Sequence, residues 1–304
     1  MSFLPANPTD PLYLCGPLAS GKSALAISLC LELDGEVVNA DPFQAYQGLS
    51  LLSGAPAEEA RAKVPHHLYG VLDPSEDCGP QAFRELVLPV IADIQARGKK
   101  PIILGGSGVY LKYLTHGPSS IPARDEALRA QLEERDNASL FSELKVLDPE
   151  GAAITDPQNR RYLMRALEIC LLSGQKMSTI KAAELQKSQE ITAALTGLYL
   201  LWENDHSKQR ISSRTMQILE KGGSEEVEAL REEASSTCRK VIGFSEIEDH
   251  LDGKLSLKEC HKGFHTSTRR SAKRQRSWVK KEGWLEDILC PFPFDAKVGS
   301  FRGV

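Results

Sequence analysis

The stretch that decides the fold is Leu12-Tyr13-Leu14-Cys15-Gly16-Pro17-Leu18-Ala19-Ser20-Gly21-Lys22-Ser23, an apolar run followed by the pattern G-x-x-x-x-G-K-S. A helical pattern, Ala24 to Leu31, comes next. A strand, a glycine loop and a helix in this order bind phosphate, because the loop N–H groups and the helix N-terminus both favour an anion. The sequence therefore predicts a phosphate loop in an α/β fold.

We expect this loop to bind a diphosphate or a triphosphate. Lys22 would reach a terminal phosphate, and the Ser23 hydroxyl would ligate Mg²⁺. A simple glycine turn before a helix is the alternative, but it leaves both residues without a role. The predicted diphosphate-binding residues are Gly16, Pro17, Leu18, Ala19, Ser20, Gly21, Lys22 and Ser23.

A carboxylate, Asp41, ends the next apolar run, which begins at Glu36. The strongest apolar run downstream, 101–104, ends in glycines without a carboxylate. Because loops beyond the carboxyl ends of parallel strands share one crevice, we expect Asp41 to face Lys22. There it suits a general base, or an orienting acceptor, for an incoming nucleophile. The alternative is a helix N-cap on a surface loop.

The chain first alternates short apolar runs with helical patterns, and helical spacing then continues without an obvious strand. Strands are predicted at 12–15, 36–40, 69–72 and 101–104, with a helix over 80–97, which favours a parallel sheet. From 119 to 194 apolar residues recur at helical spacing; strand character returns at 198–202, and the rest is predicted helical. We therefore expect a P-loop NTPase-like α/β core of residues 1–118 and 195–304, ending in a basic helix, with an all-helical insertion at 119–194.

Net charge argues against a generic nucleic-acid binder, because the 304 residues carry only −4. The charge is nevertheless uneven, and a phosphate backbone senses local basicity. One stretch opposed only by Glu259 contains Lys258, Lys262, Arg269, Arg270, Lys273, Arg274, Arg276, Lys280 and Lys281. A merely solvated helix face is the alternative for this stretch.

The cysteine pattern and the lengths of the apolar runs indicate where in the cell the protein is expected. Seven cysteines without a C-x-x-C pair predict reduced thiols and no zinc site; His261 and His265 share a helix face but lack a third ligand nearby. The N-terminus does not read as a secretory signal, and no apolar run reaches the ~20 residues of a membrane span. We expect a cytoplasmic monomer without membrane contact.

Several blocks, in order from residue 12 to 284, together resemble the signature blocks of tRNA dimethylallyltransferases, also called tRNA isopentenyltransferases. The phosphate loop and Asn39-Ala40-Asp41 with Gln44 and Tyr46 are the first. The others are Pro65-His66-His67-Leu68 with Leu72-Asp73-Pro74, Gly105-Gly106-Ser107 with Tyr110-Leu111, Arg165-Ala166-Leu167-Glu168, and Thr268 to Trp278. The chain lacks the C-terminal zinc-finger extension of eukaryotic members, which favours a bacterial or organellar type.

The resemblance implies transfer of a dimethylallyl group from dimethylallyl diphosphate to N6 of the adenine 3′-adjacent to the anticodon in tRNA, with Mg²⁺. Negative charge on the departing diphosphate must be stabilised, a task for Lys22, Ser23 and the loop amides. Asp41 would orient and deprotonate the amine. The base must also be flipped out of its stack, at a cost of roughly a few kcal/mol that backbone contacts offset.

The tRNA-binding residues implied by the resemblance are Asp41, Pro42, Phe43, Gln44, Ser107, Arg161, Tyr162, Arg165, Arg269, Arg270, Lys273 and Arg274. Arg165 has an alternative role in a surface salt bridge to Glu168. We expect Trp278 to belong to the core, and His66 and His67 to be structural, because the chemistry requires no imidazole.

The chain departs from the family pattern at Leu18 (usually threonine), Pro42 (usually serine), Tyr162 (usually arginine) and Lys240 (arginine in many members). The Gly-Thr-Ala-Lys-Pro block is reduced to Ser53-Gly54-Ala55-Pro56, without its lysine. These changes concern donor preference and efficiency more than reaction type.

Two other function classes fit parts of the sequence. One is a P-loop small-molecule kinase, or a prenyltransferase of free adenine nucleotides; a small acceptor needs neither the insertion nor the basic helix. The other is a non-catalytic RNA-binding protein, which would not retain Lys22, Ser23 and Asp41 together.

Overall fold

The computed structural model describes residues 7–17, 20–201, 204–289 and 302–303. The chain divides into two compact units, Met1–Gly117 with Leu195–Val304, and Pro118–Ala194. The predicted insertion, 119–194, differs from the second unit by one residue. No helix in the described ranges combines the length and apolar character needed to cross a membrane.

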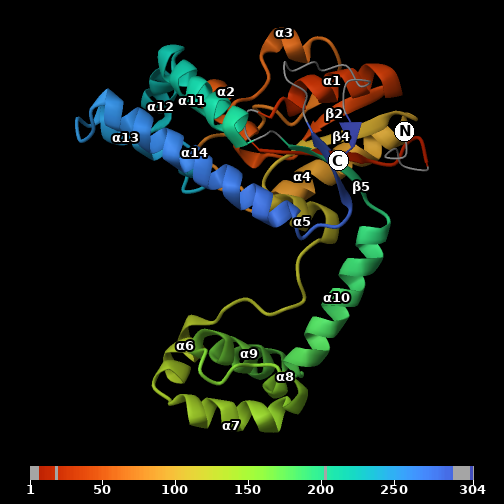
Figure 1. Ribbon diagram of the computed structural model, residues 1–304, viewed down its shortest axis with the longest axis vertical. Helices are drawn as coiled ribbons and strands as arrows, with labels where there is room; N and C mark the ends of the chain where they lie inside the picture. The colour runs from red at the N-terminus through yellow and green to blue at the C-terminus, as the bar shows by residue number, and fades with distance from the viewer. Residues whose placement is uncertain (1–6, 18–19, 202–203, 290–301, 304) are drawn as a thin grey trace. The chain divides into compact units, whose positions relative to one another are not determined.

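The first unit is built on a sheet of seven strands in the order β3-β2-β4-β1-β5-β6-β7. Figure 1 shows α1 (Lys22–Leu33) on one side of this sheet and α4 (Pro80–Ala96) and α5 (Gly108–His116) on the other. Neighbouring strands are parallel except β6 and β7, which are antiparallel. The bounds are β1 Leu12–Cys15, β2 Gly35–Asn39, β3 His66–His67, β4 Lys100–Gly105, β5 Thr196–Leu201, β6 Leu285–Leu289 and β7 Arg302–Gly303. The chain leaves β1 toward β2 and later returns to β5 on the other side, so the sheet reverses its order at β1, where ligands bind in such folds.

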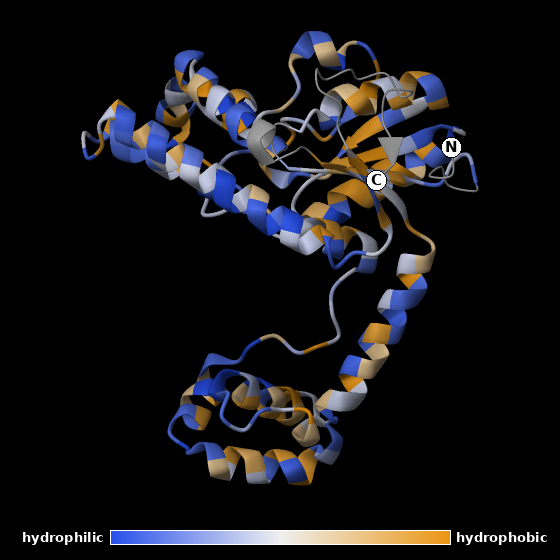
Figure 2. Ribbon diagram, viewed as in Figure 1, coloured by the Kyte–Doolittle hydropathy of each residue, from blue (hydrophilic) through white to orange (hydrophobic). Residues whose placement is uncertain are grey.

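Helices cover both faces of this sheet, and every residue of β1 is therefore buried. Because strand side chains alternate, Leu12 and Leu14 join one apolar cluster with α1 (Lys22–Leu33). Tyr13 and Cys15 join the opposite cluster, which includes residues of α4 (Pro80–Ala96), α5 (Gly108–His116), α13 (Phe244–Leu251) and α14 (Leu257–Val279). The strands are hydrophobic and α14 is largely hydrophilic (Figure 2). The α/β prediction is confirmed.

Short helices complete the first unit. They are η1 Pro42–Gln44, α2 Ser50–Ser53, α3 Glu58–Arg61, α12 Gly223–Leu230 and η2 Cys238–Lys240, together with the longer α11 Asn204–Glu220. Helix α14 begins at a capping box in which Ser256 and Glu259 satisfy each other's backbone N–H groups.

The second unit is entirely helical in structure. It contains α6 Glu126–Glu133, α7 Asn137–Leu147, α8 Pro149–Ala153, α9 Arg160–Ser173 and α10 Met177–Ala193. Its own core includes the leucines that recur at helical spacing in the sequence, Leu132, Leu140, Leu144, Leu163 and Leu167. Leu171 of the same pattern is 40% exposed.

Two strand predictions were wrong. Residues 69–72 form no strand; β3 lies earlier, at His66–His67, and Leu72 makes only an isolated bridge to Tyr46. The positive φ angles of Leu68 (65°) and Gly70 (61°) interrupt the extended run. The C-terminal part was predicted helical throughout, yet β6 pairs with β5; its charged centre, Glu286-Asp287, hides the strand pattern. Trp202, in the predicted strand 198–202, lies outside the described residues.

A buried carboxylate, Glu36, joins β2 to β3 and to the end of α4. Its Oε2 accepts from His67 Nε2 at 2.7 Å and from Arg97 Nη2 at 2.9 Å, and its Oε1 pairs with Arg97 Nη1. The Arg97 guanidinium, helped by the His67 ring, holds the pKa of Glu36 at about 2, although burial acts in the opposite direction. His67 therefore has the structural role that was expected.

Replacing this carboxylate, Glu36→Gln, should lower the free energy of unfolding at pH 7 by roughly 1.5–3 kcal/mol, since the charged hydrogen bonds are lost. The pKa of Glu36 is depressed, so this stabilisation is present above the ordinary value of 4.5 and is lost as pH falls toward 2. Urea unfolding of both proteins at pH 7, 5 and 3.5 measures it. The control is Asp93→Asn, which removes an ion pair to the same Arg97 from a carboxylate that is 67% exposed. Equal losses in both variants would contradict the prediction.

Candidate active site at the phosphate loop

The phosphate loop connects β1 directly to α1. Gly21 has φ 90° and caps α1, which begins at Lys22. The Lys22 ammonium donates hydrogen bonds to the Gly16 carbonyl oxygen at 2.7 Å and the Pro17 carbonyl oxygen at 2.9 Å. Its charge is thus held at the loop. The predicted binding residues Leu18 and Ala19 lie outside the described residues.

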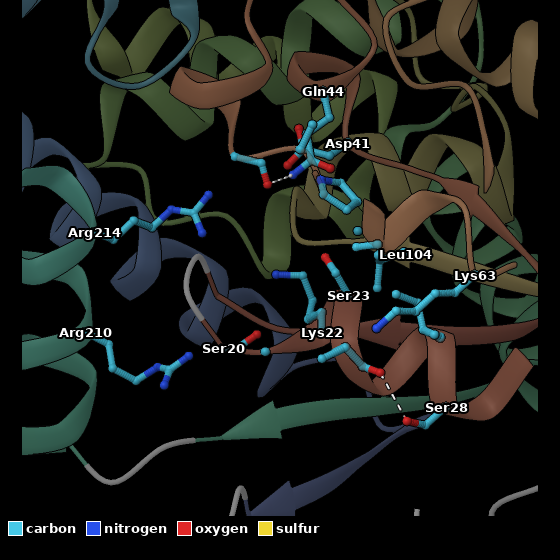
Figure 3. A pocket seen from close by; sticks show the side chains of 18 of the residues that line it. Ser20, Lys22, Ser23, Ser28, Asp41, Gln44, Lys63, Leu104, Arg210 and Arg214 are labelled. Carbon is cyan, nitrogen blue, oxygen red and sulfur yellow. Dashed lines mark hydrogen bonds between the residues drawn. The ribbon is translucent and has the colours of Figure 1, made fainter. Parts of the chain in front are cut away.

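A cavity of about 970 Å³ opens at this loop. The loop residues Ser20 to Ser23 line it, together with Asp41 and Gln44, and Arg210 and Arg214 reach it from α11 (Figure 3). Its cationic side chains are Lys22, Lys63, Arg210 and Arg214. Asp41 is the one carboxylate among the described lining residues, so the cavity favours an anion.

Arg214 carries an unpaired charge in this cavity. Its guanidinium fills the space beside Gly54, where a Cβ would lie 1.4 Å from Nη2, and Gly54 has φ +71°. Arg214 makes no hydrogen bond or ion pair with any described residue. Burial, and next the charge of Arg210, lower its pKa, although an arginine stays protonated. A partly buried, unpaired cation is stabilised by an anionic ligand.

Asp41 is fixed by Asn39 and by its own short helix. The Asn39 amide donates to the Asp41 carbonyl oxygen at 2.9 Å and the Leu68 carbonyl oxygen at 2.8 Å, and Asn39 Oδ1 accepts from the Asp41 N–H at 2.9 Å. Asp41 Oδ1 accepts from the Phe43 N–H at 3.2 Å, which makes Asp41 the N-cap of η1. Asp41 is thus an N-cap, as the alternative supposed, but it lines a cavity and does not lie on an open surface loop. Burial raises the pKa of this carboxyl, opposed by Lys22 and the Phe43 N–H.

A second cavity, of about 400 Å³, also reaches Asp41. It is lined by Phe43 and Ser107, and by Arg274, Gln275 and Trp278 from α14. Asp41 therefore stands at the junction of a cationic cavity and a second cavity of mixed character. This is the position required of a base between a leaving anion and its acceptor.

Glycines at the end of β4 allow these parts to meet. A Cβ on Gly105 would lie 3.0 Å from the Ala40 carbonyl oxygen. A Cβ on Gly106 would lie 2.9 Å from the Gly16 carbonyl oxygen and 2.8 Å from Gln275 Nε2. The phosphate loop, the Asp41 segment and α14 thus approach one another across two residues without side chains.

The two faces of α14 divide the predicted tRNA-binding residues. Ser271, Arg274, Gln275 and Trp278 recur at helical spacing and line the second cavity. Arg269, Arg270 and Lys273 line a separate basic groove of about 540 Å³, together with Lys208, Arg276 and Lys280. No carboxylate occurs among the described residues of this groove. The helix therefore presents one face to the second cavity and another face to the basic groove.

The residues of η1 differ in their access to the two cavities. Pro42 is buried and lines neither cavity, whereas Phe43 lines the second cavity. The Gln44 amide lies 3.4 Å from the carbonyl oxygens of Ser53 and Gly54 and lines the first cavity. The geometry therefore supports contacts by Phe43 and Gln44 more directly than by Pro42.

In the helical unit, the predicted tRNA-binding residues Arg161 and Tyr162 lie against each other, and Arg165 is bound to other residues of the unit. Tyr162 is 57% exposed, and the Arg161 guanidinium lies 5.1 Å from its ring centroid. Arg165 pairs with the buried Glu168 at 2.6 Å and donates to the Pro122 carbonyl oxygen at 2.5 Å. The alternative role of Arg165 in a salt bridge is therefore what its geometry favours, although the partner is buried rather than on the surface.

Sequence reasoning missed several cavity residues. Arg210 and Arg214 were not selected, although their i, i+4 spacing puts both on one helix face. Trp278 was assigned to the core; it packs on Gly108, where a Cβ would lie 2.4 Å from the ring, yet it also lines the second cavity. Gln275 lies in the block Thr268 to Trp278 but was not selected as a site residue.

Oxygen ligands, rather than a cluster of acids, are available for a cation. No group of three or more His, Cys, Asp or Glu side chains that could hold a metal occurs in the described part of the chain. The Ser23 hydroxyl lines the first cavity and makes no hydrogen bond to a described residue. Six described cysteines are free and buried.

Comparisons with known proteins identify the family of the chain. A family model described as IPP transferase matches residues 44–282. The chain is 36% identical over 277 residues to a tRNA dimethylallyltransferase of Akkermansia muciniphila, which covers 91% of this chain and 92% of the relative. A Geobacter metallireducens protein of the same name is 35% identical over 295 residues, with 95% of each covered. The chain belongs to the IPP transferase family. It is therefore a transferase, and the resemblance seen in its sequence is confirmed.

Solved members of the family have the same fold. A tRNA isopentenylpyrophosphate transferase from Bacillus halodurans superposes with a TM-score of 0.68 at 29% identity, covering 93% of this chain and 92% of the other. A eukaryotic dimethylallyltransferase, described as acting on tRNA, gives a TM-score of 0.68 at 28% identity, covering 92% of this chain and 74% of the other. The P-loop-type core is thus shared by these proteins.

Adding a methyl group at the meeting point of the loops should disturb the site. Gly106→Ala should cost about 1–3 kcal/mol of stability, because the Gly16 backbone cannot move aside freely, and it should weaken diphosphate binding. Urea unfolding and calorimetric titration with diphosphate measure the two effects. The control is Gly283→Ala, where a Cβ meets nothing within 4 Å. Wild-type behaviour of Gly106→Ala would show that the approach is looser than described.

Proposed function

We propose that this chain transfers a dimethylallyl group from dimethylallyl diphosphate to N6 of the adenine 3′-adjacent to the anticodon in tRNA and releases diphosphate. The observation that carries the proposal is that Asp41 lines both the cationic cavity and the cavity bordered by α14. The names of the relatives support the donor group and the acceptor class. A small acceptor would leave the basic groove without a function.

The cationic cavity suits the departing diphosphate. As the bond between the allylic carbon and the diphosphate oxygen breaks, its electron pair remains on oxygen, where Lys22, Arg210 and Arg214 stabilise it. The adenine nitrogen forms the new bond to that carbon. These cations are already in place before charge develops, so little reorganisation is needed.

Mg²⁺ fits the donor set at the loop. Ser23 supplies a hydroxyl oxygen beside the expected diphosphate oxygens, and hard oxygen ligands with retained waters are what Mg²⁺ prefers. Ser23 would hold the ion, which would neutralise part of the charge on the leaving group.

Asp41 serves the acceptor. Its carboxylate accepts a hydrogen bond from the exocyclic amine, orients it toward the allylic carbon, and takes its proton as the new bond forms. A raised pKa makes the carboxylate a better proton acceptor than an exposed aspartate. The second cavity would receive the flipped base, while the basic groove would bind backbone phosphates.

The reaction itself is tested with purified protein, dimethylallyl diphosphate and a tRNA transcript. Nucleoside mass analysis should show one added dimethylallyl group on the adenosine next to the anticodon. A transcript with guanosine at that position is the matched control. Modification of free adenine nucleotides instead of tRNA would reject the proposal.

Removing the base should separate binding from chemistry. Asp41→Ala should lower single-turnover transfer by roughly 10²–10⁴-fold while diphosphate affinity stays near wild type. Asp41→Asn should fall between Asp41→Ala and wild type, because it keeps an acceptor oxygen but takes no proton. Since the pKa of Asp41 is raised, the wild-type rate should rise with pH above the ordinary aspartate range, as the carboxylate forms. Lys22→Ala is the converse control, with diphosphate binding lost and tRNA binding kept. Rescue of Asp41→Ala by excess Mg²⁺ would instead indicate a metal-holding role.

The two faces of α14 should give different phenotypes. Combined Arg269→Ala, Arg270→Ala and Lys273→Ala should weaken tRNA binding and reduce its log–log salt slope by about one per lost phosphate contact, with turnover at saturating tRNA largely kept. Arg274→Ala, at the acceptor cavity, should lower turnover even at saturating tRNA. Titrations at several salt concentrations and single-turnover rates distinguish them. An unchanged salt slope in the triple variant would show a merely solvated face.

A further inference from the structure

Lys63 lies in the wall of the cationic cavity, in the loop after α3. Figure 3 shows its side chain extending toward the start of α1, from the side opposite α11. The loop backbone is anchored, because the Pro65 carbonyl oxygen accepts from the Val37 N–H of β2 at 2.9 Å and Val64 is 8% exposed. The ammonium is thus carried to the cavity by a fixed backbone.

The charge of Lys63 is uncompensated. Its ammonium makes no hydrogen bond or ion pair with any described residue, although Glu58 and Glu59 lie in the adjacent α3. Asp41 is the one carboxylate among the described residues of the cavity, and its Oδ1 accepts from the Phe43 N–H. A cation that has no protein partner and faces an anion-binding cavity is available to the ligand.

The position of Lys63 bears on one place where the sequence departs from the family pattern. The block Ser53-Gly54-Ala55-Pro56 lacks the lysine found in the family motif. Ala55 and Pro56 line the same cavity as Lys63. Lys63, eight positions after Ala55, therefore supplies this cavity with a lysine that the block at 53–56 lacks.

We propose that Lys63 is a second diphosphate-binding lysine, which compensates for the lysine missing from the block at 53–56. The inference rests on the proposed function only in taking a diphosphate ester as donor. An exposed lysine must be ordered on binding, so its contribution is moderate. It contacts the diphosphate before and during departure alike, and its loss should therefore raise KM rather than lower kcat.

The first experiment measures Lys63→Ala in the full chain. Calorimetric titration with inorganic diphosphate should show binding weakened roughly 3- to 10-fold. KM for dimethylallyl diphosphate should rise by a similar factor with kcat within about twofold of wild type. The control is Lys99→Ala, a lysine outside the cavity that pairs with Asp34, which should bind diphosphate normally. A fall in kcat with unchanged KM would overturn the assignment.

The second experiment restores the missing lysine. Ala55→Lys in the Lys63→Ala background should return diphosphate affinity to within about twofold of wild type, since either position delivers an ammonium to the cavity. Failure of this rescue would overturn the compensation. If Lys22→Ala loses binding while Lys63→Ala matches wild type, the inference on Lys63 fails alone. If Lys22→Ala also binds normally, the diphosphate site of the proposed function fails instead.

Discussion

The close approach of three chain segments at Gly105 and Gly106 is the constraint on which the site depends. The carboxyl ends of β1, β2 and β4 meet there, with the carbonyl oxygens of Gly16 and Ala40 at distances that would exclude a side chain. Parallel strands bring their carboxyl ends to one edge in any such sheet. Only glycine at the end of β4 lets the phosphate loop and the Asp41 segment share that edge closely enough to act on one substrate pair.

Because the three segments approach so closely, the carboxylate of Asp41 lies between two chemically different cavities. Lys22, Arg210 and Arg214 gather on one side of Asp41, and a wall containing Trp278 and Phe43 lies on the other. Burial raises the pKa of Asp41, and the charge of the neighbouring Lys22 opposes this rise by favouring the ionised carboxylate. Under the proposed function, a carboxylate in this balance is suited to accept a proton from a weakly nucleophilic amine.

Helix α14 connects this chemistry to RNA recognition. Its buried residues, among them Phe264 and Ala272, hold the helix to the core. A second face closes the acceptor cavity, and a third lines the basic groove. A helix with three differently occupied faces explains why α14 is largely hydrophilic (Figure 2) and yet well packed. Under the proposed function, one rigid element would bind backbone phosphates and place the base.

The sequence by itself determined the features that depend on neighbouring residues. The run from Leu12 to Ser23 predicted β1 with its bounds. It also predicted α1, which begins two residues before and ends two residues after the predicted range 24–31, and the apolar periodicity located the helical unit to within one residue. Asp41 was found because it ends an apolar run. Each of these signals lies within about a dozen residues, the range over which periodicity and turn chemistry act.

Only the tertiary structure decided which distant side chains meet. Arg214 and Lys63 reach the loop from α11 and from the segment after α3, and the sequence around each resembles that of any solvated surface. The charged strand β6 exists because β5 offers it an edge. Such pairings are set by long-range packing, and a local pattern carries no information about the partner. For this reason the chemistry of the loop could be predicted from sequence, whereas the cation set and the junction at Asp41 could not.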